Sequence, residues 1–380
     1  MRFSRIRLEN WRNFGSIDVQ LQNRAFIVGA NASGKSNLLD VFRFLRHLVI
    51  PGGGFQEAVH SRGGVSIIRN LAARRRSDVV IDVEMTNDDR IWRYRIEFNQ
   101  GQRDPAPTLS QEKIWDKGRI VLDRPDKLDG NDPARLSQTL LEQTFANREF
   151  RVVSDFFESI SYSHVVPQLV RDTERYMGRQ FDPYGSDFLE QIATTKKRTQ
   201  DARLRYIQTA LKIAIPQLIR LELHRDEKGI AHLRGKYQHW RPQGAWQYET
   251  EFSDGTLRLM GLLWALLDGQ GPLLLEEPEI SLHPGVVRHI PQMIHLIQRE
   301  RKTAIRQIFL STHSNDLLSD EGIAPDEVLL LSQTNEGTTI RRSVEIEEVM
   351  QELGAGFTIA DTVLPRTEPP NVQQLLLFNQ

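Results

Sequence analysis

One segment near the N-terminus has glycine, lysine and serine at the spacing of a phosphate-binding loop. Residues 29–36 read Gly-Ala-Asn-Ala-Ser-Gly-Lys-Ser. Glycine lets the backbone curl so that its N–H groups point at phosphate oxygens, and the amides that begin a helix add to them. In this pattern Lys35 would neutralise the β- and γ-phosphates of ATP and Ser36 would ligate Mg²⁺. The predicted nucleotide-binding residues are Gly29, Ala30, Asn31, Ala32, Ser33, Gly34, Lys35, Ser36 and Asn37.

A pair of acids follows an apolar run much later in the chain. Residues 272–278 read Pro-Leu-Leu-Leu-Glu-Glu-Pro, which predicts a buried strand that ends in Glu276 and Glu277. Hydrolysis of ATP needs such acids, because Glu276 would hold Mg²⁺ through water and Glu277 would act as general base on the attacking water. The alternative is a surface strand capped by two acids, and the apolar run argues against it.

A serine-glycine turn and a lone histidine complete the set. Residues 253–256 read Ser-Asp-Gly-Thr before a predicted helix; they form either a second anion-binding nest or an ordinary turn and helix cap. His313 follows the apolar run 308–312. A lone histidine there is usually structural, but its position after the other three elements predicts a γ-phosphate sensor. The predicted catalytic residues are Lys35, Glu277 and His313.

The elements that must position these residues follow from the hydrophobic periodicity. A short apolar strand at 25–28 precedes the phosphate loop and an apolar-periodic helix at 38–48 follows it. Alternation between 79 and 123 predicts hairpin strands, and the spacing between 133 and 215 predicts helices. From 245 onward the α/β pattern resumes. Its predicted elements are helices at 257–267, 286–299 and 346–353 and buried strands at 272–275, 306–310 and 328–331.

These patterns predict an α/β P-loop NTPase fold with a mixed β-sheet core, an antiparallel β lobe and a mainly helical insertion. We expect the core to be split between residues 1–125 and 245–345, with the insertion at 126–244. Residues 346–380 are expected to form a C-terminal helix and a loose tail, because prolines accumulate there.

The composition excludes several classes of protein. The 380-residue chain has no cysteine, so disulfides, thiol catalysis and zinc thiolate sites are excluded. Its formal net charge is −1, which argues against nucleic-acid binding through bulk charge but not against a local basic patch. No apolar run reaches the ~20 residues of a membrane span, and the N-terminus lacks the apolar core of a signal peptide. We therefore expect a soluble cytoplasmic protein with no membrane partner.

Taken in order, the four elements resemble those of the ABC-type ATPases of the SMC, RecF and OLD class, over about half of the chain. The opening segment 6–14 resembles the first strand and turn of that class, and 276–284 resembles the Walker B acids and D-loop of its OLD-like branch. The resemblance implies an ABC-ATPase-type fold, ATP and Mg²⁺ as cofactors, Glu277 as catalytic base and His313 as a switch. It also implies an ATP-dependent homodimer or higher oligomer that holds two ATP molecules head to tail. The trans signature would be Ser253, Asp254, Gly255 and Thr256.

The sequence departs from this class at several positions. The first Walker B acid is Glu276 rather than the commoner aspartate, and its longer side chain still lets the carboxylate reach Mg²⁺ through water. The signature reads Ser-Asp-Gly-Thr rather than Leu-Ser-Gly-Gly-Gln. The glutamine of the Q-loop is not assigned, since Gln56 and Gln111 both remain open. Arg62 is either a phosphate contact, as in SMC-type heads, or a plain surface arginine.

The resemblance favours a role in DNA repair or in defence against phage and plasmids. OLD nucleases share this core but continue into a Toprim nuclease domain, and the residues after His313 are too few for one. We therefore expect an effector, such as a nuclease, on a separate chain. DNA or RNA is a further expected partner if two basic groups contact phosphates rather than form solvated faces. These groups are Arg69 with Arg74, Arg75 and Arg76, and Lys196, Lys197 and Arg198 with Arg203 and Arg205.

Two other functions fit the same motifs. One is a regulatory scaffold that turns over ATP slowly and sequesters a toxic partner, although Glu277 and His313 argue for hydrolysis. The other is the ATPase subunit of a membrane transporter. It is disfavoured because residues 37–252 separate the phosphate loop from the signature, a longer interval than such subunits have.

Overall fold

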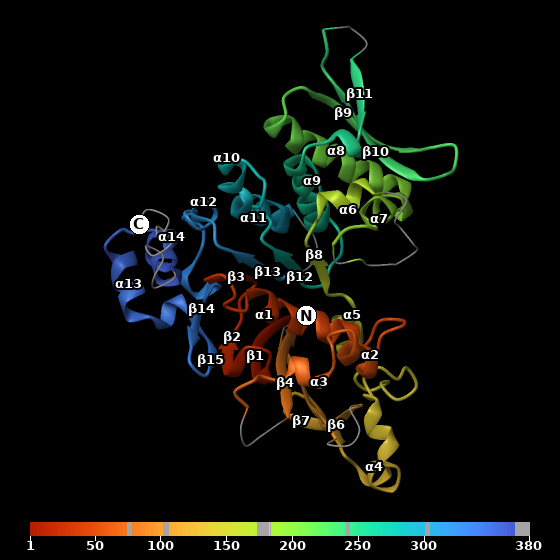
Figure 1. Cartoon of the computed structure of the whole chain (residues 1–380), viewed down its shortest axis with the longest axis vertical. Helices are drawn as coiled ribbons and strands as arrows, with labels where there is room; N and C mark the ends of the chain where they lie inside the picture. Colours follow the sequence, from red (N-terminus) through yellow and green to blue (C-terminus); the bar gives the residue numbers. More distant parts are fainter. Residues whose placement is uncertain are drawn as a thin grey trace, which may run out of the picture. The chain divides into compact units, whose positions relative to one another are not determined.

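A computed structural model describes residues 1–73, 78–87, 89–101, 106–172, 182, 184–240, 244–300 and 305–368 (Figure 1). The chain divides into two compact units, and each is described by itself. Unit 1 comprises Met1–Ser161, Gln270–Leu274 and Ala304–Gln380, and unit 2 comprises Tyr162–Gly269 and Leu275–Thr303.

Unit 1 contains an antiparallel lobe, a six-stranded sheet in the order β2-β1-β4-β5-β6-β7. Its strands alternate, so that apolar side chains such as Phe3, Ile6 and Tyr94 are buried while charged side chains lie on the opposite face. The strands are β1 Arg2–Trp11, β2 Phe14–Gln20, β4 Val79–Asn87, β5 Arg90–Gln100, β6 Pro107–Asp116 and β7 Arg119–Arg124.

The second sheet of unit 1 is mixed and has the order β15-β14-β3-β13-β12-β8. Strand β3 pairs in parallel with both β13 and β14, whereas β15 is antiparallel to β14. The boundaries between unit 1 and unit 2 fall within strands β8 and β12, so each of these strands has residues of both units. The strands are β3 Arg24–Gly29, β13 Ile308–Thr312, β14 Val328–Thr334, β15 Gly337–Arg342, β12 Leu273–Glu276 and β8 Ser161–Ser163.

The principal helix of unit 1 is α1, Lys35–His47, which buries one apolar face that includes Leu38 and Phe42. Phe42 stacks on Phe309 of β13 with ring centroids 4.5 Å apart. The other helices of the unit are α2 Phe55–His60, α3 Val65–Ile68, α4 Lys127–Asn131, α5 Arg151–Glu158, α12 Asn315–Leu318, α13 Glu347–Gly354 and α14 Ile359–Val363. Short 3₁₀ helices lie at Pro133–Ser137, Pro325–Glu327, Ser343–Glu345 and Leu364–Thr367.

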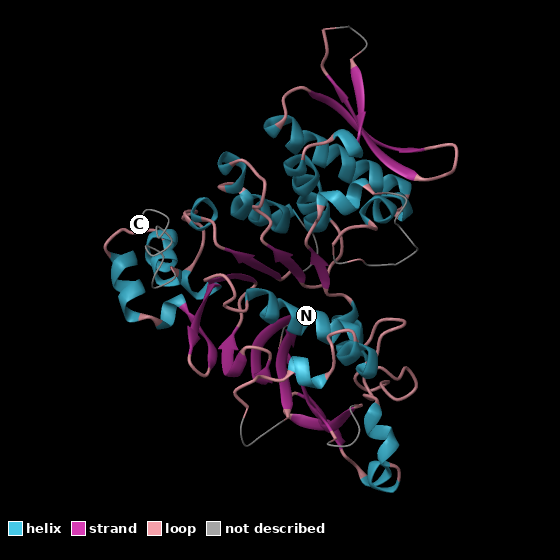
Figure 2. Cartoon of the chain, in the orientation of Figure 1, coloured by secondary structure: helices cyan, strands magenta, loops and turns pink. Residues whose placement is uncertain are grey.

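Unit 2 combines helices with a three-stranded antiparallel sheet in the order β11-β10-β9 (Figure 2). Helix α8 packs on β9 and α9 around a core that contains Leu211, Leu233 and Trp264. The helices are α6 Pro167–Arg171, α7 Phe188–Thr194, α8 Lys197–Ala214, α9 Asp254–Leu267, α10 Pro284–Val287 and α11 Ile290–Glu300, with a 3₁₀ turn at Glu249–Glu251. The strands are β9 Leu218–Arg225, β10 Ala231–Tyr237 and β11 Ala245–Tyr248.

The structure differs from the expected elements in several respects, among them the strands β9 and β10 within the segment expected to be mainly helical. The helix expected at 286–299 is divided into α10 and α11, because Pro291 lies in the first turn of the second helix and cannot continue the first. The boundaries of the two compact units also differ from those of the segments expected from the sequence. Residues 126–161 belong to unit 1, where Phe157 of α5 packs against Tyr94. The assignment of the ATPase core to 1–125 and 245–345 stays a prediction.

None of the helices that the structure describes is long and apolar enough to cross a membrane.

Candidate nucleotide-binding site

The phosphate loop joins β3 to α1 in unit 1, as the sequence predicts. Gly34 has φ of 99°, in the left-handed region that glycine tolerates best. A Cβ at Gly34 would overlap the side-chain amide of Asn13, and a Cβ at Gly29 would lie 2.5 Å from the hydroxyl of Ser33. The backbone conformation therefore requires glycine at position 34, and the close approach of the Ser33 side chain requires it at position 29.

Lys35 and Ser33 give this loop the chemistry of a phosphate site. The Lys35 ammonium is buried and donates to the carbonyls of Gly29 and Ala30 at 3.0 and 3.3 Å. The Ser33 hydroxyl is also buried and has no hydrogen-bond partner. A buried cation beside an unsatisfied hydroxyl at a helix N-terminus suits a phosphate oxygen. The residues present therefore fit the triphosphate that the motif implies.

Asn13 holds the loop in place from outside the motif. Its Nδ2 donates to the Ser33 carbonyl and to Thr338 Oγ1, both at 2.8 Å. Its Oδ1 accepts from Nδ2 of Asn37 at 2.7 Å. The side chain of Asn37, a predicted nucleotide-binding residue, is thus bound to Asn13. Trp11 Nε1 adds a bond to the Asn37 carbonyl at 2.9 Å, so that the β1–β2 corner fixes both the loop and the start of α1.

Strand register brings His313 to the same edge of the sheet as the loop. Thr312 is the register partner of Val28 in the parallel pair β13–β3, so His313 and Gly29 are the next residues on two neighbouring strands. His313 is exposed. Ligands of α/β proteins bind at the carboxyl ends of parallel strands. At this edge the phosphate loop follows β3, and His313 directly follows the neighbouring strand β13.

Arg62 is neither a surface residue nor unpaired. Its side chain is only 8% exposed and forms two hydrogen bonds to the carboxylate of Asp40, at 3.0 and 2.9 Å. It also donates to the carbonyl of Ala58 at 2.8 Å. Burial acts to raise the pKa of Asp40, but Arg62, with Arg43 and Arg12, holds that pKa below its ordinary value. The role of Arg62 as a phosphate contact stays a prediction.

In unit 2 the first Walker B acid, Glu276, ends β12 and the second, Glu277, follows it. The Tyr162 hydroxyl donates to the Glu276 carboxylate, and His164 Nδ1 lies 3.1 Å from the Glu276 carbonyl oxygen. Glu277 has φ of 42°, which is unusual for a residue other than glycine. Such backbone strain costs about 1–3 kcal/mol and gathers at functional sites. The strained position coincides with the predicted catalytic base.

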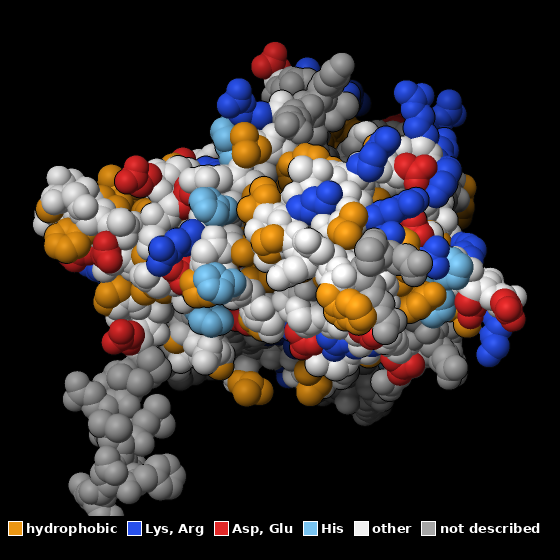
Figure 3. All heavy atoms as spheres, turned by 90° about the horizontal axis from the view of Figure 1, so that it is seen from above, with side chains coloured by type: hydrophobic (Ala, Val, Ile, Leu, Met, Phe, Trp, Pro, Cys, Tyr) orange, Lys and Arg blue, Asp and Glu red, His pale blue; other side chains and the backbone are white. Residues whose placement is uncertain are grey.

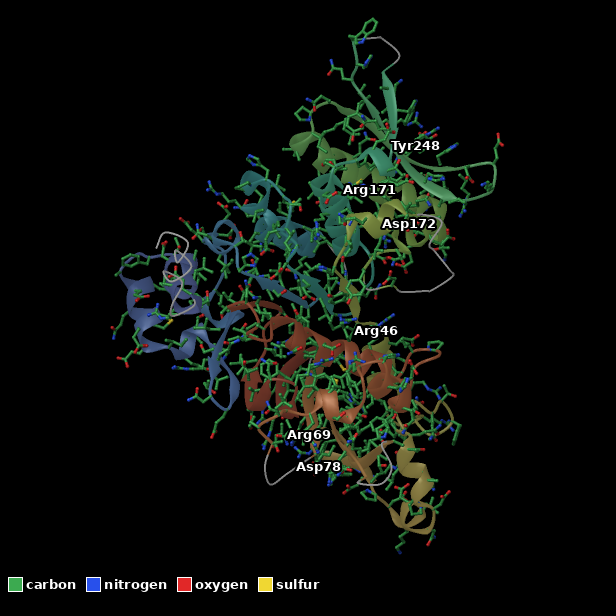
Figure 4. All side chains as sticks on the ribbon, viewed as in Figure 1. Arg46, Arg69, Asp78, Arg171, Asp172 and Tyr248 are labelled. Atoms are coloured by element: carbon green, nitrogen blue, oxygen red, sulfur yellow. The ribbon has the colours of Figure 1, made fainter. Side chains whose placement is uncertain are left out.

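The signature begins helix α9 in unit 2. Ser253 is its N-cap, with the hydroxyl 3.2 Å from the Thr256 amide. A Cβ on Gly255 would lie 2.6 Å from the carbonyl oxygen of Ser281, so the signature packs closely on the segment that follows the Walker B acids. Arg171, labelled in Figure 4, donates to the Asp254 carboxylate at 2.6 Å.

Arg258 connects the signature helix to the Walker B acids of the same unit. It lines a small pocket together with Ser163, Val165, Leu262, Leu275, Glu276 and Pro278. Burial lowers the pKa of its guanidinium, while the carboxylates of Asp254 and Glu277 act in the opposite direction. The Arg258 Nε is buried without a hydrogen-bond partner. One cation therefore lies within electrostatic reach of both the signature and the predicted base.

Several predicted contacts lie elsewhere or outside the described residues. Gln56 donates to the carbonyls of Pro107 and Ser137, and Gln111 lies in β6, so the Q-loop residue stays open. Of the basic groups, Arg74, Arg75 and Arg76 lie outside the described residues. Arg203 pairs with Asp268 at 2.7 Å.

The Mg²⁺ site remains a prediction that the donor set fits. Ser36 is exposed at the first turn of α1. No cluster of three or more His, Asp or Glu side chains able to hold a metal occurs within the described ranges. Mg²⁺ in nucleotide sites uses one or two protein ligands, water and the phosphates themselves. The assignment of Ser36 and Glu276 as its protein ligands stays a prediction.

Comparison with known proteins identifies related sequences. Residues 24–320 match the family model described as "AAA domain, putative AbiEii toxin, Type IV TA system". The chain is also similar to Endonuclease GajA of Bacillus cereus (strain VD045), with 23% identity over 350 residues that cover 84% of this chain. It spans 56% of the length of that relative.

Solved structures with a similar fold include SMC head domains. One is an SMC head bound to the C-winged helix domain of ScpA, with a TM-score of 0.55, 16% identity and coverage of 92% of this chain and 100% of that one. Another is the Pyrococcus yayanosii Smc head with a coiled coil and joint, with a TM-score of 0.52, 11% identity and coverage of 93% and 99%. At these identities the likeness concerns the fold, which is that of an ABC-type ATPase head.

Proposed function

Since the chain belongs to the family described as "AAA domain, putative AbiEii toxin, Type IV TA system", we propose that it binds ATP and hydrolyses it to ADP and phosphate. The observation that carries this proposal is the phosphate loop, where buried Lys35 and the unsatisfied Ser33 hydroxyl lie at the N-terminus of α1. The exposed His313, one strand away at the same edge, supports it.

In the proposed reaction Lys35 and the loop amides bind the phosphates and hold them in line for attack. Glu277 takes the proton of the attacking water. His313 contacts the γ-phosphate and reports whether it is present. Ser36 and Glu276 would hold Mg²⁺, which neutralises the charge that develops on the phosphate oxygens.

We further propose that ATP is hydrolysed between two copies of the chain. The signature residues 253–256 of one copy would meet the γ-phosphate held by the phosphate loop of the other. Support comes from the position of these residues at the N-terminus of α9, where helix amides and the helix dipole favour an anion. A two-fold arrangement in which each copy contributes to the other's site is the common form of a closed dimer.

The biological role is a separate proposal, based on the names of the related proteins. The name of the relative, an endonuclease, favours an ATPase that acts on or senses nucleic acid in DNA repair or antiviral defence and controls an effector such as a nuclease. The family description, which names a toxin and a type IV TA system, favours a second function. In that function the chain is a regulatory scaffold that sequesters a toxic partner and turns over ATP slowly.

A comparison of ATP turnover in three proteins tests the proposed activity. We expect Lys35→Ala to reduce turnover by about 10²-fold or more, since it removes the buried cation at the phosphates. The matched control is Lys127→Ala, because Lys127 is an exposed lysine of α4 and its loss should leave the rate unchanged. Equal rates for wild type and Lys35→Ala would refute the activity.

A further inference from the structure

The three-stranded sheet of unit 2 has one face in the core and one face open. Leu221 of β9 and Leu233 of β10 point into the core of the unit. The alternate residues therefore lie on the outer face. We call five of them the basic sheet face. They are Arg220 on β9, Arg234 and Lys236 on β10, and Trp246 and Tyr248 on β11.

Strand register brings these five side chains together. Lys236 is the register partner of both Arg220 and Trp246, and Arg234 is the partner of Tyr248. The Arg234 guanidinium carbon lies 4.6 Å from the centroid of the Trp246 ring. Tyr248, labelled in Figure 4, lies on β11 where that strand pairs with β10. The cations of β9 and β10 therefore lie beside the aromatic rings of β11.

The basic sheet face carries more positive than negative charge. Its nearest acid, Glu222, is shared by Arg220 and Arg234 at 2.8 and 2.7 Å. Among the residues that the structure describes, no acid pairs with Lys236. Arg220 is 64% exposed and Trp246 is 37% exposed. On the surface in Figure 3, Lys and Arg side chains are most numerous on the right, with Asp and Glu side chains among them.

The outer face of the antiparallel lobe in unit 1 shows what a neutralised sheet face looks like. Arg93 there also stacks on a tryptophan, Trp115, at 4.6 Å, but it pairs with Asp82 at 2.6 Å. Lys113 pairs with Asp123 at 2.8 Å. The lobe thus has the same cation–aromatic stacking without a surplus of positive charge, whereas the basic sheet face has both.

We propose that the basic sheet face binds single-stranded nucleic acid. Exposed aromatic rings stack on unpaired bases, and the neighbouring cations bind the phosphates that join them. A duplex hides its base faces within the stack and would use only the cations. Stacking on bases and ion pairing with phosphates are common to DNA and RNA, so the proposal covers both kinds of single strand. The proposal rests on nucleic acid as a partner of the proposed function and not on ATP turnover.

The test is fluorescence anisotropy with a labelled oligothymidine of about 20 nucleotides, the full-length chain and no ATP. We expect Trp246→Ala to weaken binding by about 10-fold, because one stacked base is lost. Lys236→Ala should reduce the slope of log affinity against log salt by about 0.7. Trp115→Ala and Lys113→Ala are the matched controls from the lobe and should bind as wild type does.

Three further arms make the result decisive. A blunt duplex of the same length should bind more weakly than the single strand, and oligouridine should bind about as well as oligothymidine. Trp246→Phe should retain most of the affinity, since phenylalanine also stacks. Equal binding by Trp246→Ala and wild type, or equal loss in Trp115→Ala, would overturn the proposal. ATP turnover of Trp246→Ala should be unchanged, and Lys35→Ala should still bind the strand, so failure of either proposal is recognised separately.

Discussion

At the scale of single residues, the phosphate loop depends on a partner that its own motif does not contain. Asn13 donates to the Ser33 carbonyl and accepts from Asn37, and it also reaches Thr338. The loop residues are predictable from the sequence because their spacing is local. Asn13 as their anchor is not, because the contact with Thr338 joins residues 325 positions apart. The same holds for Tyr162, which binds Glu276 across 114 positions.

Asn13→Ala tests this anchoring at the residue scale. The substitution leaves every residue of the motif in place but removes three side-chain hydrogen bonds, each worth about 0.5–1.5 kcal/mol. We expect affinity for ATP to fall by about 10-fold in a titration by calorimetry. Asn131→Ala, at the exposed end of α4, is the control and should bind ATP normally. Unchanged affinity in Asn13→Ala would show that the loop holds its shape without this residue.

At the scale of elements, periodicity predicts the strands and helices that are long or strongly apolar. It predicts β3, α1 and the hairpins of the lobe, whose apolar positions repeat clearly. It does not predict β9 to β11, because their outer face carries charged and aromatic residues and their inner face is only partly apolar. Periodicity also predicts a single helix where the structure has α10 and α11, which Pro291 separates.

The junction between β7 and α4 yields a prediction about pH. Hydrogen bonds from buried Arg124 to Asp129 lower the pKa of that carboxyl to about 2. Since the folded pKa lies below the unfolded one, the stabilisation is present above about pH 4 and is lost as pH falls toward 2. Asp129→Asn should lower the midpoint of thermal unfolding by a few degrees at pH 7, and this difference should shrink between pH 4 and pH 2. A difference independent of pH would contradict the ion pair.

At the scale of the whole molecule, the four predicted motifs are distributed over the two compact units. Unit 1 contains the phosphate loop and His313, and unit 2 contains the signature and the Walker B acids. The order of the four motifs allows the ABC-type fold to be predicted from the sequence, and the likeness to SMC heads agrees with it. The order of the motifs does not show which copy of the chain supplies each of them. Assembly of two copies depends on the surfaces that meet, and these cannot be predicted from a local sequence pattern.

Mixing two inactive variants tests most directly whether ATP is hydrolysed between two copies. Lys35→Ala removes the phosphate cation, and Ser253→Asp keeps an N-cap on α9 while it places a carboxylate against the γ-phosphate. Each variant alone should be inactive. In an equimolar mixture of exchanging symmetric dimers, one site of each mixed dimer is wild type, so about a quarter of wild-type turnover should return. A mixture as inactive as its separate components would contradict hydrolysis between copies.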